Sequence, residues 1–412
     1  MIDVNDFAGR SDSEVIENAL SHRDGDGVVV IPPRQSERDT DRREWVLDRA
    51  ILLPGDTTLV LRGCVLKLSD QCRDNFIRSA NCGLGIEDPR PLQNIHIRGE
   101  GGARLVGADH PRATGDGSKI LACPCPYRPE DIVAMAPWVP EERRSVEKLD
   151  FWDAHDHSYG TDAGKEDQSQ YGDWRGIGIL LANVEGFSIE GVTVAASHGW
   201  GISLEACGMG TIRDVAFDAR MYRWIDGMKQ NIENQDGIDL RNGCHHILID
   251  GVTGHTGDDV IALTAIASKG AAPGGQTRTT HVMPGDWTRR ESGIHDVIIR
   301  NVNAWSQLCY TIRLLSCDTH IWNVIVDGVI DCPPEDVQHG GVLLVGEGDS
   351  DYGKNLPDGI RAVTVSNMIC HTTPVTVKGY LRDAVIRGVV NLSGKPTVDA
   401  RRPDSLMNVR VE

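Results

Sequence analysis

Three aspartates stand in two short polar segments of the chain, NQDGID at 234–239 and TGDD at 256–259. Asp258 follows Asp236 at a distance of about two dozen positions, and Asp259 follows directly. Hydrolysis of a glycosidic bond needs such a group, because one carboxylic acid protonates the leaving oxygen while another carboxylate activates water or attacks. Crowded carboxylates also raise the pKa of at least one member, which keeps a proton available for the acid role. These three aspartates are therefore the candidate catalytic residues.

Two segments so far apart in sequence meet only if the chain winds back on itself with about that period. Neighbouring strands of a sheet stand about 4.8 Å apart, so Asp236 and Asp258, about one winding apart, are expected to stack on each other. A short repeat indicates such winding: apolar, any, apolar, polar, then Gly, Asn or Asp, and usually Val. The central apolar residues of its copies are Ile97, Ile189, Ile212, Ile249, Ile299, Val326, Val365 and Ile386. Several of their steps are about 20–30 residues long and others are longer, as expected for stacked coils that carry insertions.

The repeat predicts an all-β fold, a right-handed parallel β-helix that forms a single domain over residues 1–412. Its alternation places every second side chain inside, and its Asn, Asp or Gly supplies the left-handed backbone of a corner. Asp239 and Asp250 are interpreted as such corner residues. An all-β sandwich stays open, because periodicity alone does not fix the winding, whereas the scarcity of amphipathic helical windows after the amino-terminal segment disfavours a βαβ fold.

The amino terminus departs from the repeat. Ser11 and Glu14 fit a helical capping box, and a short apolar stripe follows them. The segment VVVIPP at 28–33 then reads as a buried strand that ends at prolines. A short capping helix over the open end of the solenoid is predicted here, since terminal units of a solenoid must be atypical.

Residues 109–175 also leave the repeat and read as a long irregular insertion that projects from one side. It contains Asp153, His155, Asp156 and His157, which are metal ligands by type, although a solvated loop is the preferred interpretation. CPC at Cys123 and Cys125 has no partner pair at zinc spacing. The sequence therefore predicts no metal and no other cofactor.

The composition limits the partners. A formal net charge of -18 argues against nucleic acid, because phosphate binding needs a basic surface. No apolar run reaches the length that a membrane span needs, so no membrane partner is expected, and the amino-terminal segment lacks the features of a signal peptide. Eleven cysteines at irregular spacing favour free thiols in a cytoplasmic protein over a secreted disulfide framework. An oligosaccharide substrate is the expected partner, and homo-oligomerisation stays open.

Residues 234–263, NQDGIDLRNGCHHILIDGVTGHTGDDVIAL, resemble glycoside hydrolase family 28, the polygalacturonase-like family. That family carries an N-T-D segment and a G-D-D segment about one coil later, and SHGWGISLEAC at 197–207 fits the coil that precedes them. The resemblance implies a pectin-lyase-like β-helix and hydrolysis with inversion by a single displacement. It further implies that Asp258 is the general acid and that Asp236 and Asp259 position or activate water.

Two motifs of the family are not matched. The coil after Asp259, NAWSQLCYTIRLLS, lacks the histidine of the family's G-H-G, for which His198 or His255 is a substitute. The family's R-I-K grips a uronate carboxylate with two cations, whereas Arg313 here precedes two leucines. His198, His255, Arg313 and Trp200 are the candidate substrate-binding residues, and a neutral sugar or a modified uronide stays open beside a uronate.

Two other functions fit the same scaffold. In a β-helix lyase or a fructotransferase, Asp236, Asp258 and Asp259 would form a calcium cage, with Arg241 or Arg313 as the base. A non-catalytic carbohydrate-binding solenoid would need exposed aromatic side chains for stacking on sugars. The available tryptophans are Trp174, Trp200, Trp224, Trp287, Trp305 and Trp322.

Overall fold

The computed structural model describes residues 1–35, 43–70, 72, 74–83, 86, 88–110, 173–225, 228–232, 234–267, 282–283, 292–337, 339–348 and 353–412. The predicted insertion at 109–175 therefore lies almost wholly outside the described residues, together with Asp153, His155, Asp156, His157, Cys123 and Cys125.

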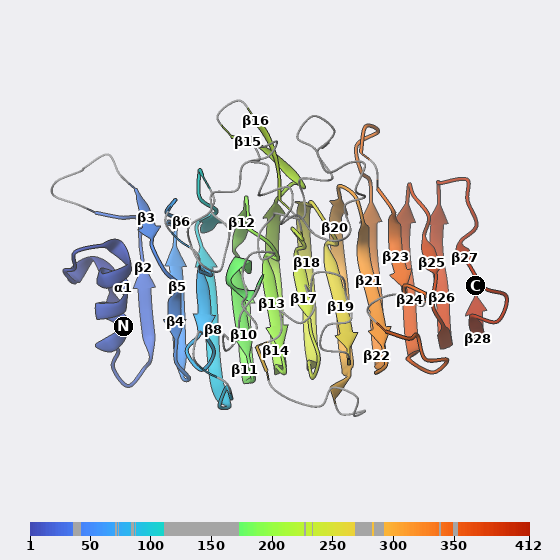
Figure 1. Ribbon diagram of the computed structural model, residues 1–412, viewed down its shortest axis with the longest axis horizontal. Coiled ribbons are helices and arrows are strands. Elements are labelled where there is room, and N and C mark those ends of the chain that lie inside the picture. The colour runs from blue at the N-terminus through green and yellow to red at the C-terminus, as the bar shows by residue number, and fades with distance from the viewer. Residues whose placement is uncertain are drawn as a thin grey trace, which may run out of the picture.

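A single α-helix occurs in the described chain, and it stands at the blue end of the molecule (Figure 1). The 3-10 helix η1 (Val4–Asp6) precedes α1 (Asp12–Ser21), and the Ser11 side chain accepts the Glu14 N–H at 3.3 Å. Val15, Ile16, Ala19 and Leu20 are buried against the first coil. The predicted capping helix is confirmed.

The rest of the chain builds two long sheets whose paired strands are all parallel, which is a parallel β-helix as predicted. Sheet A contains β1 (Ile2–Asp3), β2 (Val28–Ile31), β5 (Thr57–Arg62), β8 (Leu92–Glu100), β11 (Val184–Glu190), β14 (Gly208–Asp218), β18 (His245–Thr256), β20 (Ile294–Ser306), β22 (Ile321–Asp331), β24 (Ile360–Cys370), β26 (Leu381–Asn391) and β28 (Leu406–Val411), with β3 (Glu44–Leu47), β6 (Val65–Leu68), β9 (Arg104–Val106) and β12 (Thr193–Ala195) beside this path. Sheet B contains β4 (Ile51–Leu53), β7 (Ile77–Ser79), β10 (Ile179–Ala182), β13 (Ile202–Glu205), β17 (Ile238–Leu240), β19 (Ile261–Ile266), β21 (Tyr310–Cys317), β23 (Gly341–Val345), β25 (Val375–Val377) and β27 (Val398–Ala400). A small antiparallel hairpin, β15 (Tyr222–Ile225) and β16 (Met228–Asn231), stands outside both sheets. Strands succeed one another in chain order along the long axis (Figure 1), so each coil contacts only its neighbours.

The register of sheet A confirms the repeat residue by residue. All eight aligned apolar residues, from Ile97 to Ile386, are paired one to the next across successive strands. Each is buried, so they form one continuous row of the core. The inward apolar residues of a coil are covered on both sides by those of the neighbouring coils. This burial supplies hydrophobic stabilisation that a single coil would lack.

The corners follow the sequence prediction for Gly, Asn and Asp. In the repeat, Asp214, Gly251 and Asn301 have φ of 51°, 80° and 56°. These left-handed values are strained for most side chains but are tolerated by Gly, Asn and Asp. Asp250 lies within β18, directly before the corner glycine, so its interpretation as the corner residue is wrong by one position.

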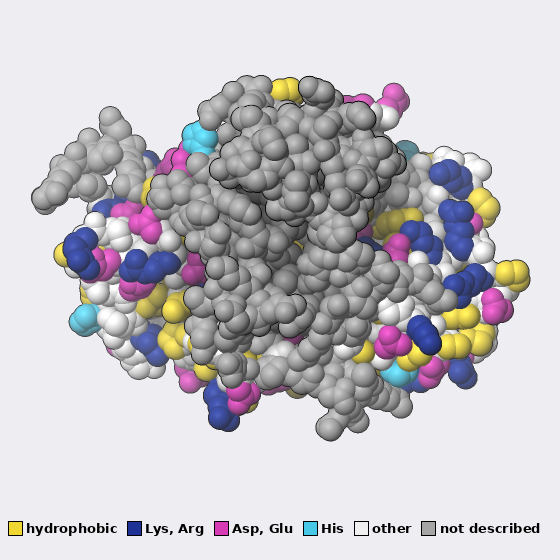
Figure 2. Space-filling model, viewed as in Figure 1, with side chains coloured by type: hydrophobic (Ala, Val, Ile, Leu, Met, Phe, Trp, Pro, Cys, Tyr) yellow, Lys and Arg dark blue, Asp and Glu magenta, His cyan; other side chains and the backbone are white. Residues whose placement is uncertain are grey.

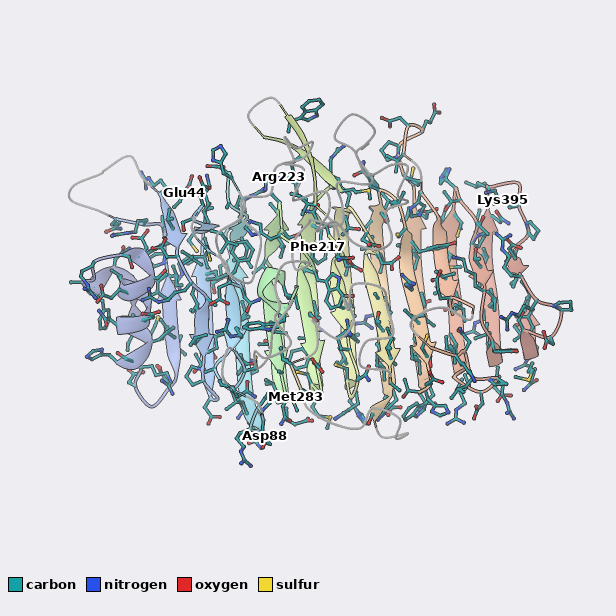
Figure 3. All side chains as sticks on the ribbon, in the orientation of Figure 1. Glu44, Asp88, Phe217, Arg223, Met283 and Lys395 are labelled. Carbon is teal, nitrogen blue, oxygen red and sulfur yellow. The ribbon has the colours of Figure 1, made fainter. Side chains whose placement is uncertain are left out.

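Aromatic packing inside the helix explains two glycines next to the candidate site. Phe217 is buried between the two sheets (Figure 3). A Cβ on Gly201 would lie 2.7 Å from the Phe217 ring, and a Cβ on Gly237 would lie 2.9 Å from it. The residues just before these glycines, Trp200 and Asp236, are thereby held close to the coil interior.

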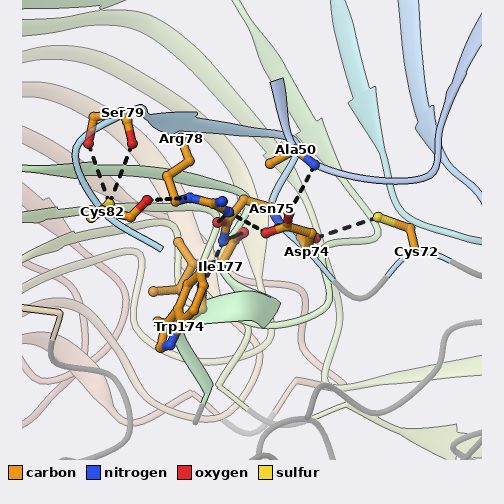
Figure 4. Close-up of polar contacts among 9 residues, drawn as sticks. All are labelled: Ala50, Cys72, Asp74, Asn75, Arg78, Ser79, Cys82, Trp174 and Ile177. Carbon is orange, nitrogen blue, oxygen red and sulfur yellow. Dashed lines mark hydrogen bonds and ion pairs between the residues drawn. The ribbon is translucent and has the colours of Figure 1, made fainter. Parts of the chain in front are cut away.

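Polar contacts join β7, in the part of sheet B formed by the amino-terminal coils, to residues 174–177. Arg78 donates to the Cys82 carbonyl at 2.9 Å and to the Asn75 side chain at 2.9 Å, and it pairs with Asp74 (Figure 4). The Asn75 amide donates to the carbonyls of Trp174 and Ile177, each at 2.7 Å (Figure 4). This network fixes the 3-10 helix η4 (Asp173–Gly176) on the sheet.

Acidic and basic side chains are interspersed over both ends of the molecule in the view of Figure 2. Within the described part of the chain, no helix is long and apolar enough to cross a membrane.

Candidate functional site: a carboxylate cluster on sheet B

The register of sheet B places Asp236 beside Asp259. Ile238 pairs with Ile261, and the Gly237 N–H donates to the Asp259 carbonyl at 2.9 Å. Asp236 and Asp259 therefore occupy equivalent positions of successive coils. The prediction that Asp236 stacks on Asp258 is wrong by one position, because backbone hydrogen bonding sets the register.

Asp239 belongs to the same cluster. It is the middle residue of β17, pairs with Ser203 and Ala262 on the neighbouring strands, and its side chain points outward between the inward Ile238 and Leu240. The interpretation of Asp239 as a corner residue is wrong, since Asp239 does not have the positive φ of the corner residues. Although it faces outward, Asp239 is only 1% exposed.

Burial and mutual repulsion control the proton affinity of the cluster. Burial, followed by the charges of neighbouring aspartates, raises the pKa of Asp236 well above its ordinary value. Burial also raises the pKa of Asp239 well above its usual range and that of Asp259 to about 6. The cluster therefore keeps protons near neutral pH, as general acid catalysis requires.

Two buried carboxylate oxygens of the cluster lack a hydrogen-bond partner among the described residues. They are Oδ1 of Asp236 and Oδ2 of Asp239. Buried polar atoms are rarely left without a partner, so each marks a place where a water molecule or a substrate hydroxyl would be stabilised.

Arg313 is the cation of the cluster. Its Nη1 lies 3.3 Å from Asp259 Oδ2 and its Nη2 lies 2.5 Å from Glu347, which also accepts from Lys378 at 3.1 Å. Burial would lower the pKa of Arg313, but Asp259 and Glu347 outweigh it and raise that pKa. The predicted substrate-binding arginine thus binds two protein carboxylates, and a lysine two coils further on completes the network.

Asp258 differs from its neighbours because its side chain is partly exposed. Its Oδ1 accepts the Asp259 N–H at 2.9 Å, and Thr256 donates to its carbonyl at 2.5 Å. Asp258, Asp259 and Cys309 each place one potential ligand atom within 4.8 Å of the others. However, burial and then Asp258 raise the pKa of the Cys309 thiol, which disfavours the thiolate that binds metals.

Trp200 lies one coil before Asp236, since the Gly201 N–H donates to the Asp236 carbonyl at 2.9 Å. The Arg241 guanidinium carbon lies 4.8 Å from the centre of the Trp200 ring. Burial lowers the pKa of Arg241, although Glu205 and Asp239 oppose this effect. The structure therefore brings Trp200 and Arg241 together on the flank of sheet B that carries the aspartates.

The two predicted histidines have other contacts. His198 is buried and its Nε2 accepts the Ala108 N–H at 2.9 Å, and burial lowers its pKa to about 3. His255 bonds the Ala219 carbonyl at 2.9 Å through Nδ1, and its ring lies 4.9 Å from that of Trp305. A neutral, buried His198 suits a structural position.

A different histidine, which the sequence reasoning missed, lies one coil beyond Cys309. The Gly340 N–H donates to the Cys309 carbonyl at 2.7 Å, and the side chain of His339 is 1% exposed. His339 Nε2 lies 3.0 Å from Asp331 and its Nδ1 lies 2.9 Å from the Ser306 carbonyl. The segment QHGG at 338–341 was the available signal in the sequence.

No protein-family model matches the chain, and no curated protein matches it significantly. Several solved structures share its overall shape. They include a family 28 exopolygalacturonase from Yersinia enterocolitica, at 13% identity over 99% of this chain and 78% of that chain with a TM-score of 0.45. A polygalacturonase from Erwinia carotovora is 14% identical over 98% of this chain and 95% of that chain with a TM-score of 0.49. The A-module of a mannuronan C-5 epimerase from Azotobacter vinelandii is 10% identical over 99% and 95% with a TM-score of 0.47. At these identities the likeness is one of fold, and no residue role is taken from it.

Proposed function

We propose that this protein is a glycoside hydrolase that acts on an oligosaccharide through Asp236, Asp258 and Asp259. The observation that supports it is the meeting of these carboxylates on two successive coils, where burial raises the pKa of Asp236 and that of Asp259 to about 6. Glycosidic hydrolysis needs one protonated and one ionised carboxyl group in a single site. An excess of buried carboxylates over nearby cations provides both states near neutral pH.

In this proposal Asp258 delivers the proton to the leaving oxygen, because it is the partly exposed member and can reach a sugar from outside, and the neighbouring Asp236, whose pKa burial raises, keeps a proton within the cluster. Asp259 is the ionised member, since it binds Arg313 and accepts the Tyr310 N–H at 2.9 Å. Asp236 and Asp259 occupy equivalent positions of neighbouring strands, whose backbones stand about 4.8 Å apart, and in this proposal one water binds between their carboxyl groups.

The distance between acid and base decides which anomer forms first. Inverting enzymes separate the two carboxyl groups by about 6.5–9.5 Å so that water fits between them. An oxygen of Asp258 lies within 4.8 Å of one of Asp259. Inversion by this pair therefore requires the partly exposed Asp258 side chain to turn toward the sugar, and proton NMR of the first product tests this step.

The decisive experiment incubates the full chain with a mixed library of neutral and uronate-containing oligosaccharides and weighs the products by mass spectrometry. Hydrolysis adds one water to each cleaved chain. Asp258→Asn is expected to slow turnover about 10²–10⁴-fold, the usual contribution of a general acid. Asp214→Asn is the matched control, because Asp214 is an exposed corner residue with φ of 51°, a conformation that Asn tolerates.

Two results would overturn the proposal. Unsaturated products that absorb in the ultraviolet and vanish with a chelator would indicate a lyase with a calcium cage. Saturable binding of a glycan without any mass change, in the native chain and in Asp258→Asn alike, would indicate a binding solenoid.

A further inference from the structure

A column of aromatic rings lies on sheet A, whereas the carboxylate cluster lies on sheet B. His245, His295 and Trp322 are paired in register on β18, β20 and β22. The His245 and His295 rings stack with centres 5.5 Å apart, and the His295 and Trp322 rings stack at 4.4 Å, each pair tilted by 15°. The column therefore fixes the orientation of the middle ring, His295.

Each histidine of the column is followed by a second residue with a metal-binding side chain. His246 and Asp296 have φ of 51° and 56°, which places both at the same corner of successive coils. His295 Nδ1 lies 2.7 Å from Asp296 Oδ2, and His246 Nε2 lies 3.6 Å from the same oxygen. One ligand atom from each of His246, His295 and Asp296 lies within 4.8 Å of the others.

These three side chains can be reached from solution. The side chain of His246 is 51% exposed, that of Asp296 is 33% exposed and that of His295 is 20% exposed. An ion could therefore bind here without any opening of the core.

The other atoms of these ligands are held by further partners, as is usual around a bound metal. Asp296 Oδ1 accepts from the Asn323 amide at 2.7 Å, which leaves Oδ2 facing the histidines. His246 Nδ1 lies 3.1 Å from His245 Nδ1, and His245 Nε2 lies 3.1 Å from Glu185. This chain of contacts orients the His246 ring with its Nε2 toward Asp296.

We propose that His246, His295 and Asp296 form a binding site for a divalent transition-metal ion of the zinc class. Two imidazoles and one carboxylate are ligands that Zn²⁺ prefers, and three protein ligands leave a fourth position for water. Metal–ligand distances of about 2.0–2.2 Å require ligand atoms about 3.3 Å apart in a tetrahedron, within the range seen here. The ion would join β18 to β20, whose coils are separated by a long segment of the sequence, and so stabilise their stacking. The site is independent of the proposed hydrolase function.

The test measures binding of Zn²⁺ to the full chain, after treatment with a chelator, by competition with a chromophoric zinc indicator. We expect one equivalent whose affinity falls at least about tenfold in His246→Ala and in Asp296→Asn. Removing the amide that holds Asp296, as in Asn323→Gly, should weaken binding by about 10–100-fold without removing a ligand. Zn²⁺ should also raise the melting temperature of the native chain more than that of Asp296→Asn.

His96→Ala is the matched control, because His96 is a histidine on β8 of the same sheet that contacts Ser188 instead of a second histidine. It should bind Zn²⁺ as the native chain does. Failure of the native chain to bind one equivalent, or equal binding by His246→Ala and the native chain, overturns the proposal. Loss of the equivalent in Cys309→Ser but not in His246→Ala would place the ion at the carboxylate cluster and also overturn it.

Discussion

The guanidinium of Arg313 lies 3.3 Å from the carboxylate of Asp259, although the two residues stand on different coils of the helix. Asp259 is 2% exposed at its side chain and Arg313 is 20% exposed, so water screens this pair weakly. The pair holds the pKa of Asp259 below the value that burial alone would give it. It is therefore the contact that keeps one member of the cluster ionised.

Arg313→Gln should raise the pKa of Asp259 above about 6 and move the acidic limb of the pH–activity profile to higher pH, because the base must be ionised. It should also lower the free energy of unfolding by about 2–3 kcal/mol, because the buried Asp259 loses its cation, whereas Glu347 keeps Lys378. Activity across pH and denaturant unfolding measure the two effects. Arg300→Gln is the control, since Arg300 pairs with Asp250 at an exposed site and its loss should change stability little. An unchanged pH profile in Arg313→Gln would contradict the role given to this pair.

Asp236→Asn should stabilise the protein at pH 8. A buried carboxyl group with a raised pKa binds its proton more tightly in the folded chain than in the unfolded chain. Its contribution to the free energy of unfolding is therefore complete below the pKa of the unfolded chain, about 3.8, and is lost as the pH rises above that value. Replacing the carboxyl group with a neutral amide should therefore raise the free energy of unfolding at pH 8. Thermal unfolding between pH 4 and pH 8 should show this difference shrinking toward pH 4. A variant that is less stable than the native chain at pH 8 would contradict this prediction, because it would mean that a neighbouring group stabilises the ionised form of Asp236.

His198→Ala should destabilise the fold by about 2–4 kcal/mol, because it opens a cavity and leaves the Ala108 N–H without its acceptor. The folded-state pKa of about 3 is below the ordinary value of 6.5, so the native chain loses stability as the pH falls through this window. His198→Ala lacks this pH-dependent loss of stability. The difference in free energy of unfolding between the native chain and the variant should therefore become smaller at acidic pH. Denaturant unfolding at pH 4.5 and pH 7.5 checks this. Unchanged stability together with lost turnover would instead restore His198 as a substrate ligand.

Much of the fold was predictable because it depends on patterns of residue type that repeat over short stretches of sequence. Inward apolar residues recur once per coil, and Gly, Asn or Asp follows where the backbone must adopt positive φ. These features depend on side-chain type and strand alternation alone, so Ile97 and Ile386 could be assigned to the same row despite the long sequence between them. The Ser11 cap was equally local.

The candidate site was predictable only in part. The residue types and the near-coil spacing of Asp236, Asp258 and Asp259 pointed to a cluster, but the hydrogen-bond register moved the stacked pair to Asp236 and Asp259. It also moved Asp239 from a corner into a buried strand. A shift of one position reverses which face a side chain occupies, and sequence spacing does not resolve it.

The sequence by itself determined the coil, its inward rows, its corners and the residue types of the cluster, because each follows from short-range alternation and turn chemistry. Only the tertiary structure decided which charges meet. Insertions of unequal length separate the coils, so the pairing of Arg313 with Asp259, of His339 with Asp331 and of His246 with Asp296 depends on stacking. Burial, and with it the pKa of each carboxyl group in the cluster, is likewise a property of the assembled helix.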